Sequence, residues 1–229
     1  MTIEADRLGC QAAHARLLET VATVTDADVA RPSRLPDWTL GHVLTHLARN
    51  ADSHVRMLEA AARGEVAGQY PGGNERRAAD IAAGAVRTAA ALADDVQRTI
   101  DRLEATWRAT PAEAWATGVG RVASGAEWPL AELPFYRWRE VEIHHADLGL
   151  GFGWADWSDA YVDADLPRNL ARLPERLAPG ADLGFVDTLA AAVPKRRLLA
   201  WLVGRLDGEP IGEPIGGHTE FPAIGPWRY

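Results

Sequence analysis

The sequence is poor in residues on which several kinds of chemistry depend. It contains a single cysteine, Cys10, which can form neither an internal disulfide nor a thiolate metal cluster. Lys195 is the only lysine, and the other basic residues are arginines scattered along the chain. Lysine-based catalysis is therefore nearly excluded, and any metal site has to use histidine and carboxylate ligands.

Long hydrophobic runs and excess positive charge are also missing. No stretch of about 18 consecutive apolar residues occurs, and the N-terminus lacks the features of a signal peptide. We therefore expect a cytoplasmic protein with no membrane partner. The net charge of −8, without a basic stripe, argues against nucleic acid as a partner. We expect a monomer or weak dimer that acts on small molecules.

The composition is otherwise that of a soluble globular protein, with 47% hydrophobic and 24% charged residues. Apolar residues recur at helical spacing in four segments, which are separated by connections rich in proline and glycine. The segments cover residues 3–24, 40–63, 75–108 and 133–148. Between the last two, residues 111–130 show no regular pattern. The sequence predicts a mainly α protein built on a four-helix bundle.

The composition changes after Gly153, where two tryptophans precede a further helical segment from Ser158 to Leu177. Another apolar helix is expected around Leu198 to Gly204, followed by a tail rich in glycine and proline. We therefore predict two domains, a bundle over residues 1–153 and a smaller C-terminal domain over residues 154–229.

Polar residues form a stripe on each of two predicted helices. On the second helix they recur at every fourth position: His42, His46, Asn50 and His54. On the fourth helix three residues share one face: Glu140, His144 and Asp147. Burial of such groups is costly unless they are paired or coordinated, so the stripes should meet each other or a shared metal. Two histidines and one carboxylate with an open position are typical of catalytic zinc, and the same set suits ferrous iron.

Simpler interpretations of these residues stay open. Histidines at helical spacing often form ordinary hydrogen bonds, and Glu140 can be read as one half of a solvated ion pair with Arg137 or Arg139. His42 and Asp147 either orient the site or make core hydrogen bonds. Four further histidines have no predicted role; we expect the first two to be exposed and the others to lack companions: His54, His145, His14 and His218.

Two strings carry a resemblance to a known family. LPDWTLGHVLTHLARN at residues 35–50 and RWREVEIHHADLG at residues 137–149 resemble the signature helices of the mycothiol-dependent maleylpyruvate isomerase family. LLAWLVGR at residues 198–205 and FPAIGPW at residues 221–227 extend the resemblance. It implies a DinB-like four-helix bundle with a small α/β domain at the C-terminus.

The resemblance also implies ligands and chemistry. It implies zinc bound by His46, Glu140 and His144, and an active-site cation at Arg205, which could otherwise be a charge at a helix end. Mycothiol would be the thiol cosubstrate, and an unsaturated keto acid, maleylpyruvate, would be isomerised to fumarylpyruvate. Cys10 has no basic neighbour to activate it, so its expected role is packing.

Two rival functions remain for the same residues. A zinc-dependent mycothiol S-transferase would use the same thiolate but release a stable conjugate. A non-catalytic metal-binding bundle would have no reaction at all. The sequence alone does not separate these alternatives from the isomerase.

Overall fold

The computed structural model of the protein describes residues 2–177, 188, 191–206 and 224–225. The chain divides into two compact units, Met1–Gly151 and Phe152–Tyr229. Each unit is described by itself below.

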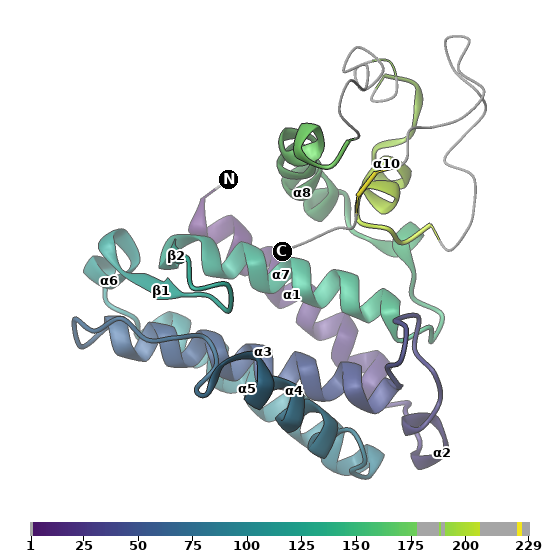
Figure 1. The fold of residues 1–229 in the computed structure, drawn as a ribbon, viewed down its shortest axis with the longest axis horizontal. Helices are drawn as coiled ribbons and strands as arrows, with labels where there is room; N and C mark the ends of the chain where they lie inside the picture. The colour runs from purple at the N-terminus through teal and green to yellow at the C-terminus, as the bar shows by residue number, and fades with distance from the viewer. Residues whose placement is uncertain (1, 178–187, 189–190, 207–223, 226–229) are drawn as a thin grey trace. The chain divides into compact units, whose positions relative to one another are not determined.

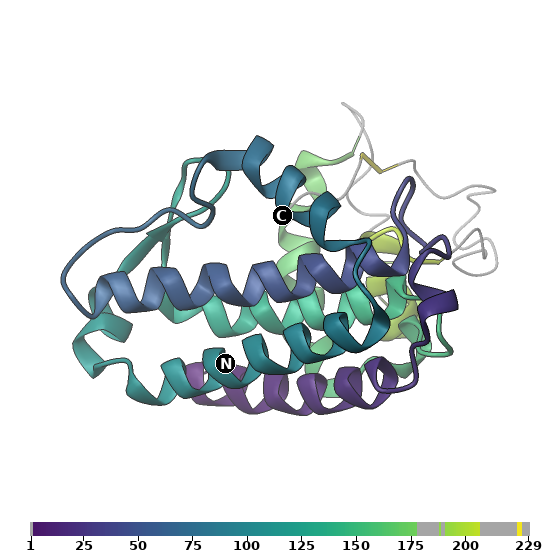
Figure 2. The same cartoon turned by 90° about the horizontal axis from the view of Figure 1, so that it is seen from below.

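Four long helices build the first unit: α1 (Ile3–Val21), α3 (Leu40–Ala61), α5 (Ala89–Ala109) and α7 (Leu133–Asp147). They run side by side in both views of the fold (Figure 1, Figure 2). Helix α3 packs against α5 and α7, and α1 packs against the same two helices. The ring encloses apolar side chains with almost no exposure, including Leu17, Leu44, Leu92, Leu103 and Val141. The predicted mainly α class and four-helix bundle are confirmed.

The prediction of a single helix over residues 75–108 is wrong, because the structure has two helices in this segment. Helix α4 (Gly73–Gly84) ends before the turn that leads into α5, and the side chain of Thr88 caps the new helix. Helix α3 approaches this turn closely: a Cβ atom on Gly41 would lie 2.1 Å from the carbonyl oxygen of Ala85. The break is thus set by a cap and by close packing, neither of which interrupts the Ala-rich pattern.

The segment predicted to be irregular, residues 111–130, contains regular structure. It comprises a short helix, α6 (Ala112–Thr117), and an antiparallel pair of strands, β1 (Val119–Arg121) and β2 (Glu127–Pro129). Strands of three residues are too short to show alternation in a sequence, which explains the error. Two other short elements of this unit are α2 (Asp26–Val29) and a 3-10 turn at Leu130–Glu132.

The second unit contains α8 (Asp159–Arg172) and α10 (Lys195–Leu202), which pack against each other. Short 3-10 turns lie at Trp154–Asp156 and Leu173–Glu175, and an isolated antiparallel bridge joins Leu177 to Ile224. The helices match the two that the sequence predicts there. Most of the predicted Gly/Pro-rich tail, including His218, lies outside the described residues.

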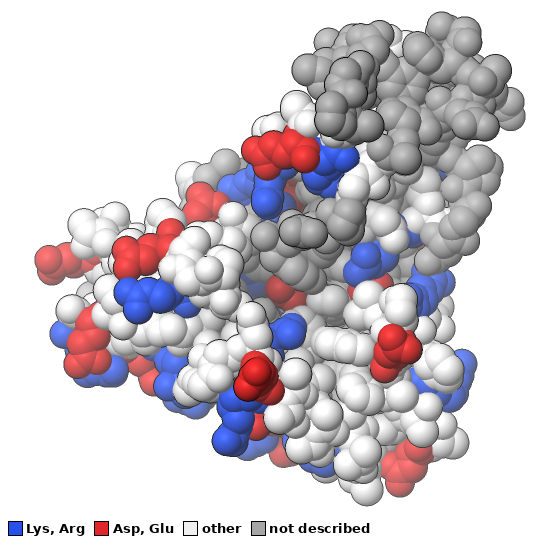
Figure 3. All heavy atoms as spheres, viewed as in Figure 1, with Lys and Arg blue, Asp and Glu red and all other residues white. Residues whose placement is uncertain are grey.

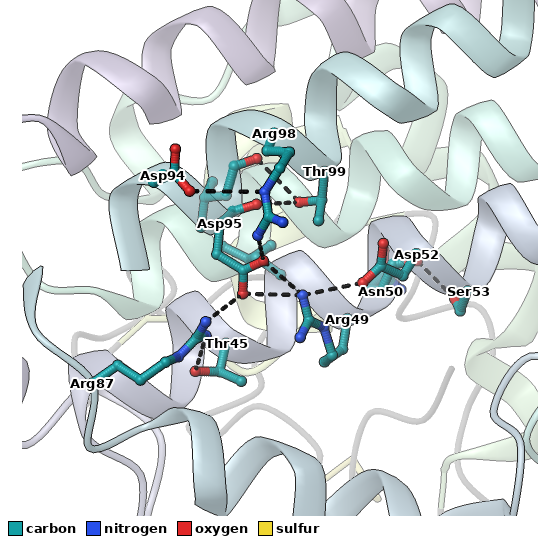
Figure 4. A network of polar contacts seen from close by, with 12 residues as sticks. Thr45, Arg49, Asn50, Asp52, Ser53, Arg87, Asp94, Asp95, Arg98 and Thr99 are labelled. Atoms are coloured by element: carbon teal, nitrogen blue, oxygen red, sulfur yellow. Dashed lines mark hydrogen bonds and ion pairs between the residues drawn. The ribbon is translucent and has the colours of Figure 1, made fainter. Parts of the chain in front are cut away.

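A buried carboxylate fastens α3 to α5 (Figure 4). Asp95 on α5 is only 2% exposed and accepts hydrogen bonds or ion pairs from three arginines. Arg49 on α3 lies 2.8 Å away, Arg87 lies 2.8 Å away, and Arg98 lies 2.7 Å away. A buried charge is tolerated only with such partners, so the network holds in place the helix that carries His46.

We expect Asp95→Ala to lower the free energy of unfolding by about 2–4 kcal/mol, since two partly buried guanidinium groups, those of Arg49 and Arg87, and the exposed one of Arg98 lose their acceptor. Asp94→Ala is the matched control, because the Asp94 side chain is 78% exposed and lies 3.7 Å from Arg98. It should cost less than about 0.5 kcal/mol. Urea unfolding of both variants measures the difference, and equal losses would contradict a bracing role for Asp95.

The surface charges in the described part of the chain are mixed. On the face shown in Figure 3, basic and acidic side chains alternate over short distances and neither sign forms a continuous patch among the coloured residues. No helix in the described ranges is both long enough and apolar enough to cross a membrane.

Candidate metal centre

The structure brings together the three residues predicted to bind a metal. His46 lies in α3, Glu140 and His144 lie one turn apart in α7, and the two helices pack against each other. The Nε2 atoms of His46 and His144 lie 2.9 Å and 3.3 Å from the same Glu140 oxygen, Oε2. One ligand atom from each residue lies within 4.8 Å of the others, and all three side chains are buried. A single ion could contact all three.

Asp147 fixes the orientation of His144. Its Oδ2 lies 2.8 Å from Nδ1 of His144, and its side chain is fully buried at the end of α7. With Nδ1 engaged in this way, Nε2 is the nitrogen that faces Glu140 and His46. Histidine ligands of metals commonly have such a carboxylate behind them, which sets the ring angle and the tautomer. Of the two roles left open for Asp147, the structure supports orientation of the site.

The electrostatics of the cluster assign its protons. Burial lowers the pKa of His46 to about 4, despite the opposing effect of Glu140, so this ring is neutral at pH 7. Burial also opposes charge on His144, but hydrogen bonds to Asp147 and Glu140 raise its pKa to about 9. The two histidines outweigh burial at Glu140 and hold the pKa of that carboxyl well below its usual range. When no ion is bound, the cluster should therefore carry one titratable proton at neutral pH, on His144.

Metal binding should release that proton. At pH 6.5 we expect about one proton per bound ion, because a metal at Nε2 of His144 replaces a proton whose pKa is about 9, whereas His46 and Glu140 have none to lose. Release should fall towards zero, and affinity should level off, above about pH 9. Calorimetric titration in buffers of different ionisation enthalpy measures the number, and release of two protons at pH 6.5 would contradict this assignment.

The neighbouring histidines of α3 have structural roles. The Nδ1 atom of His42 accepts a hydrogen bond from the backbone N–H of Thr39, 3.2 Å away, and lies 2.9 Å from the hydroxyl of the same residue. His42 is thus part of the cap that begins α3. His54, predicted to be exposed, is buried, and burial lowers its pKa to about 3. The prediction for His54 is wrong because its face of α3 points into the bundle.

Two more histidines, both buried, differ from their predictions. His145, predicted to be exposed, lies in the interface of α7 and α1, where its Nε2 is 2.7 Å from the hydroxyl of Thr20. His14, predicted to lack companions, contacts Glu104 at 2.9 Å and accepts from Arg137 at 3.1 Å. These three partners are remote in sequence from the histidines that they contact, so spacing along one helix could not reveal them.

The solvated ion pair considered for Glu140 is also absent from the described contacts. Arg137 is fully buried and donates to Asn50 and to the backbone of Leu47, each at 2.8 Å. Arg139 lies over the ring of Phe135, 4.8 Å from its centroid. The carboxylate of Glu140 instead faces the two histidines.

An aromatic wall that the sequence analysis did not identify stands beside His46. Trp38, at the end of the loop before α3, packs edge-on against the His46 ring with centroids 5.5 Å apart and keeps part of its surface exposed. The preceding residue, Asp37, has a positive φ of 63°, a conformation that is uncommon outside glycine. The tryptophan directly before the helix cap at Thr39 was the available signal.

The remaining candidates are Cys10 and Arg205. Cys10 is fully buried in α1, and burial raises the pKa of its thiol, as expected of a packing residue. Arg205 lies in the second unit, just after α10, where its Nη1 donates to the carbonyl of Val203 at 2.8 Å. Its part in the site stays a prediction.

Comparisons with known proteins agree on a family. The family described as "Mycothiol maleylpyruvate isomerase N-terminal domain" matches residues 10–149, which include all three candidate ligands. Two crystal structures resemble the chain, one of the mycothiol-dependent maleylpyruvate isomerase and one of a single-histidine mutant of it. Both have a TM-score of 0.84 and cover 99% of this chain and 98% of theirs, at 21% and 20% identity.

No curated protein sequence gives a significant match. At such low identity the crystal structures establish a shared fold, whereas the family match rests on the sequence itself and spans more than half of the chain. The chain therefore belongs to the family of the mycothiol maleylpyruvate isomerase N-terminal domain.

Proposed function

We propose that the protein is a zinc-dependent isomerase that uses mycothiol to convert maleylpyruvate into fumarylpyruvate. The observation that carries the proposal is the buried triad of His46, Glu140 and His144, whose ligand atoms lie within 4.8 Å of one another. The donor set fits zinc, because two imidazoles and one carboxylate fill three of four tetrahedral positions and leave one open. Membership of the family supports mycothiol as the thiol.

Zinc held there would lower the pKa of a thiol placed at the open position, so that a thiolate exists at neutral pH. The chain's own residues prepare the site for this. His46 presents a neutral ring, Glu140 contributes one negative charge, and Asp147 holds His144 with its Nε2 facing the same point. Because these groups are buried, water does not screen their charges.

The nucleophile has to come from outside the chain. The sequence has one cysteine, Cys10, which is fully buried in α1, and burial raises the pKa of its thiol. Among the described hydrogen-bond partners, Sγ of Cys10 contacts only His14, one helical turn away. A thiol in that state is a poor nucleophile and cannot reach a substrate. An exogenous thiol is therefore required for any thiol chemistry at this site.

The decisive experiment follows the fate of the thiol. An isomerase adds the thiolate to the cis double bond, allows rotation about the resulting single bond and eliminates the same thiolate. We therefore expect a trace of mycothiol to support many turnovers with the zinc-loaded protein, with free thiol constant while maleylpyruvate disappears. Glutathione should work weakly, because the sugar part of mycothiol supplies binding energy that glutathione lacks.

Chromatography of reactions with limiting mycothiol provides the measurement. Loss of one thiol per product, with a sulfur conjugate as that product, would replace the isomerase by the S-transferase. Absence of any thiol-dependent reaction across a panel of unsaturated acids would favour a non-catalytic bundle. Omission of the protein and omission of zinc are the two controls.

A further inference from the structure

A cleft of about 600 Å³ lies within the first unit, and one of its lining residues, Arg77, contacts His46 of the triad. One wall belongs to α3 and the other to residues 69–80, which lead into and form the first part of α4. The charged residues that line it are four arginines and two aspartates: Arg49, Arg56, Arg76, Arg77, Asp52 and Asp80. A volume of this size accommodates a small organic molecule.

The arginines of this cleft differ in what they already bind. Arg49 is held by Asp95 at 2.8 Å and by Asp52 at 3.1 Å (Figure 4). Arg76 forms an ion pair with Asp80 at 2.8 Å. Neither Arg56 nor Arg77 forms an ion pair with a carboxylate in the described part of the chain. Of these two, Arg56 is exposed, whereas Arg77 is half-buried.

Two ring side chains, those of Tyr70 and His46, hold Arg77 in position. Its guanidinium lies over the ring of Tyr70, 5.3 Å from the centroid, and its Nη2 lies 3.1 Å from Nδ1 of His46. Arginine can only donate, so Nδ1 of His46 is the acceptor and Nε2 carries the proton that faces Glu140. Arg77 thus stacks on Tyr70, another lining residue of the cleft, and donates to Nδ1 of His46, the ring nitrogen that does not face Glu140.

This hydrogen bond is incompatible with metal bound at Nε2 of His46. A neutral imidazole that binds a metal through Nε2 carries its proton on Nδ1, and two donors then face each other across 3.1 Å. Arg77 must release His46 when the metal binds and find another acceptor. Two carboxylates, Asp52 and Asp80, line the cleft that Arg77 also lines, but they already pair with Arg49 at 3.1 Å and with Arg76 at 2.8 Å. A ligand anion bound in this cleft would offer Arg77 an acceptor without such a partner.

We infer that Arg77 is a carboxylate-binding residue, which holds one carboxylate of an unsaturated keto acid in the cleft next to the metal centre. The choice of acid rests on the proposed function, whereas the anion site rests on the geometry of Arg77. A planar guanidinium suits a carboxylate because it can donate two parallel hydrogen bonds. Stacking on Tyr70 keeps the guanidinium ordered, so little conformational entropy is lost when the anion binds.

The test uses maleate as an unreactive probe, with the zinc-loaded protein and no thiol. Calorimetry should show that Arg77→Gln weakens maleate binding by at least tenfold and that Arg77→Lys restores only part of the affinity. The matched control is Arg76→Gln, because Arg76 is the neighbouring arginine of α4, lines the same cleft and is already paired with Asp80. It should change the affinity less than twofold.

A second readout separates an anion site from support of the metal. Zinc affinity, measured by competition with a chelator, should be unchanged or higher in Arg77→Gln, since the variant removes a donor that competes for His46. Weaker zinc binding would overturn the inference, as would equal maleate affinity in Arg77→Gln and the wild type. If the isomerase test fails while Arg77→Gln still loses maleate, the function is wrong and the anion site stands.

Discussion

Replacement of His46 or His144 by alanine is expected to lower zinc affinity by about a thousandfold and to abolish thiol-dependent activity. Structural zinc in zinc-finger peptides binds with apparent free energies of roughly 10–16 kcal/mol, so the loss of one of a few ligands is expected to remove several kcal/mol. Both imidazoles contact the same Glu140 oxygen, at 2.9 Å and 3.3 Å. No third histidine of the described chain is placed to replace either of them.

The matched control is His145→Ala, which changes the residue next to His144 in the same helix. His145 points to the other side of α7, where its Nε2 lies 2.7 Å from the Thr20 hydroxyl. This variant should lose some stability, because a buried hydrogen bond is broken, but it should keep full zinc stoichiometry. Elemental analysis together with thermal unfolding distinguishes the two effects. Equal zinc loss from His144→Ala and His145→Ala would remove the assignment of the ligands.

The long helices were the predictable part of the fold. Their apolar stripes set α1, α3 and α7 to within a few residues, because a bundle helix must bury one face continuously. The break between α4 and α5 was not predictable from periodicity, since it depends on a cap at Thr88 and on the close approach of Gly41 to the next turn. Tertiary contacts decided this boundary, not local propensity.

The grouping of the three candidate ligands was predictable because these residues repeat along helices. His46 belongs to one stripe, and Glu140 and His144 belong to another, so a bundle that buries both faces has to bring them together. Arg77 was not predictable, since it lies on a separate helix and contacts His46 across 31 residues of sequence. The contacts of His14, predicted to lack companions, were missed for the same reason, as its partners come from α5 and α7.

Arg205→Ala is expected to leave zinc in place and to lower kcat/KM by about 10²–10³-fold, the cost of removing one positioned donor for a developing or fixed negative charge. The family resemblance implies this role for Arg205, and the residue lies in the second unit, whereas the three candidate metal ligands lie in the first. Lysine should rescue poorly, because an ammonium group cannot form the paired hydrogen bonds that a guanidinium donates to a carboxylate.

The control for this prediction is Arg196→Ala in the same unit, where Arg196 forms an ion pair of 2.6 Å with the exposed Asp159. That variant should keep both zinc and turnover, since exposed pairs contribute little. Zinc content and initial rates with saturating mycothiol measure all three variants. Arg205 is tied to the backbone of its own turn through Val203, so thermal unfolding has to accompany the kinetics. A fully folded, zinc-loaded Arg205→Ala protein with unchanged turnover would leave Arg205 as a helix-end charge and would place substrate recognition on groups of the first unit, among them Arg77.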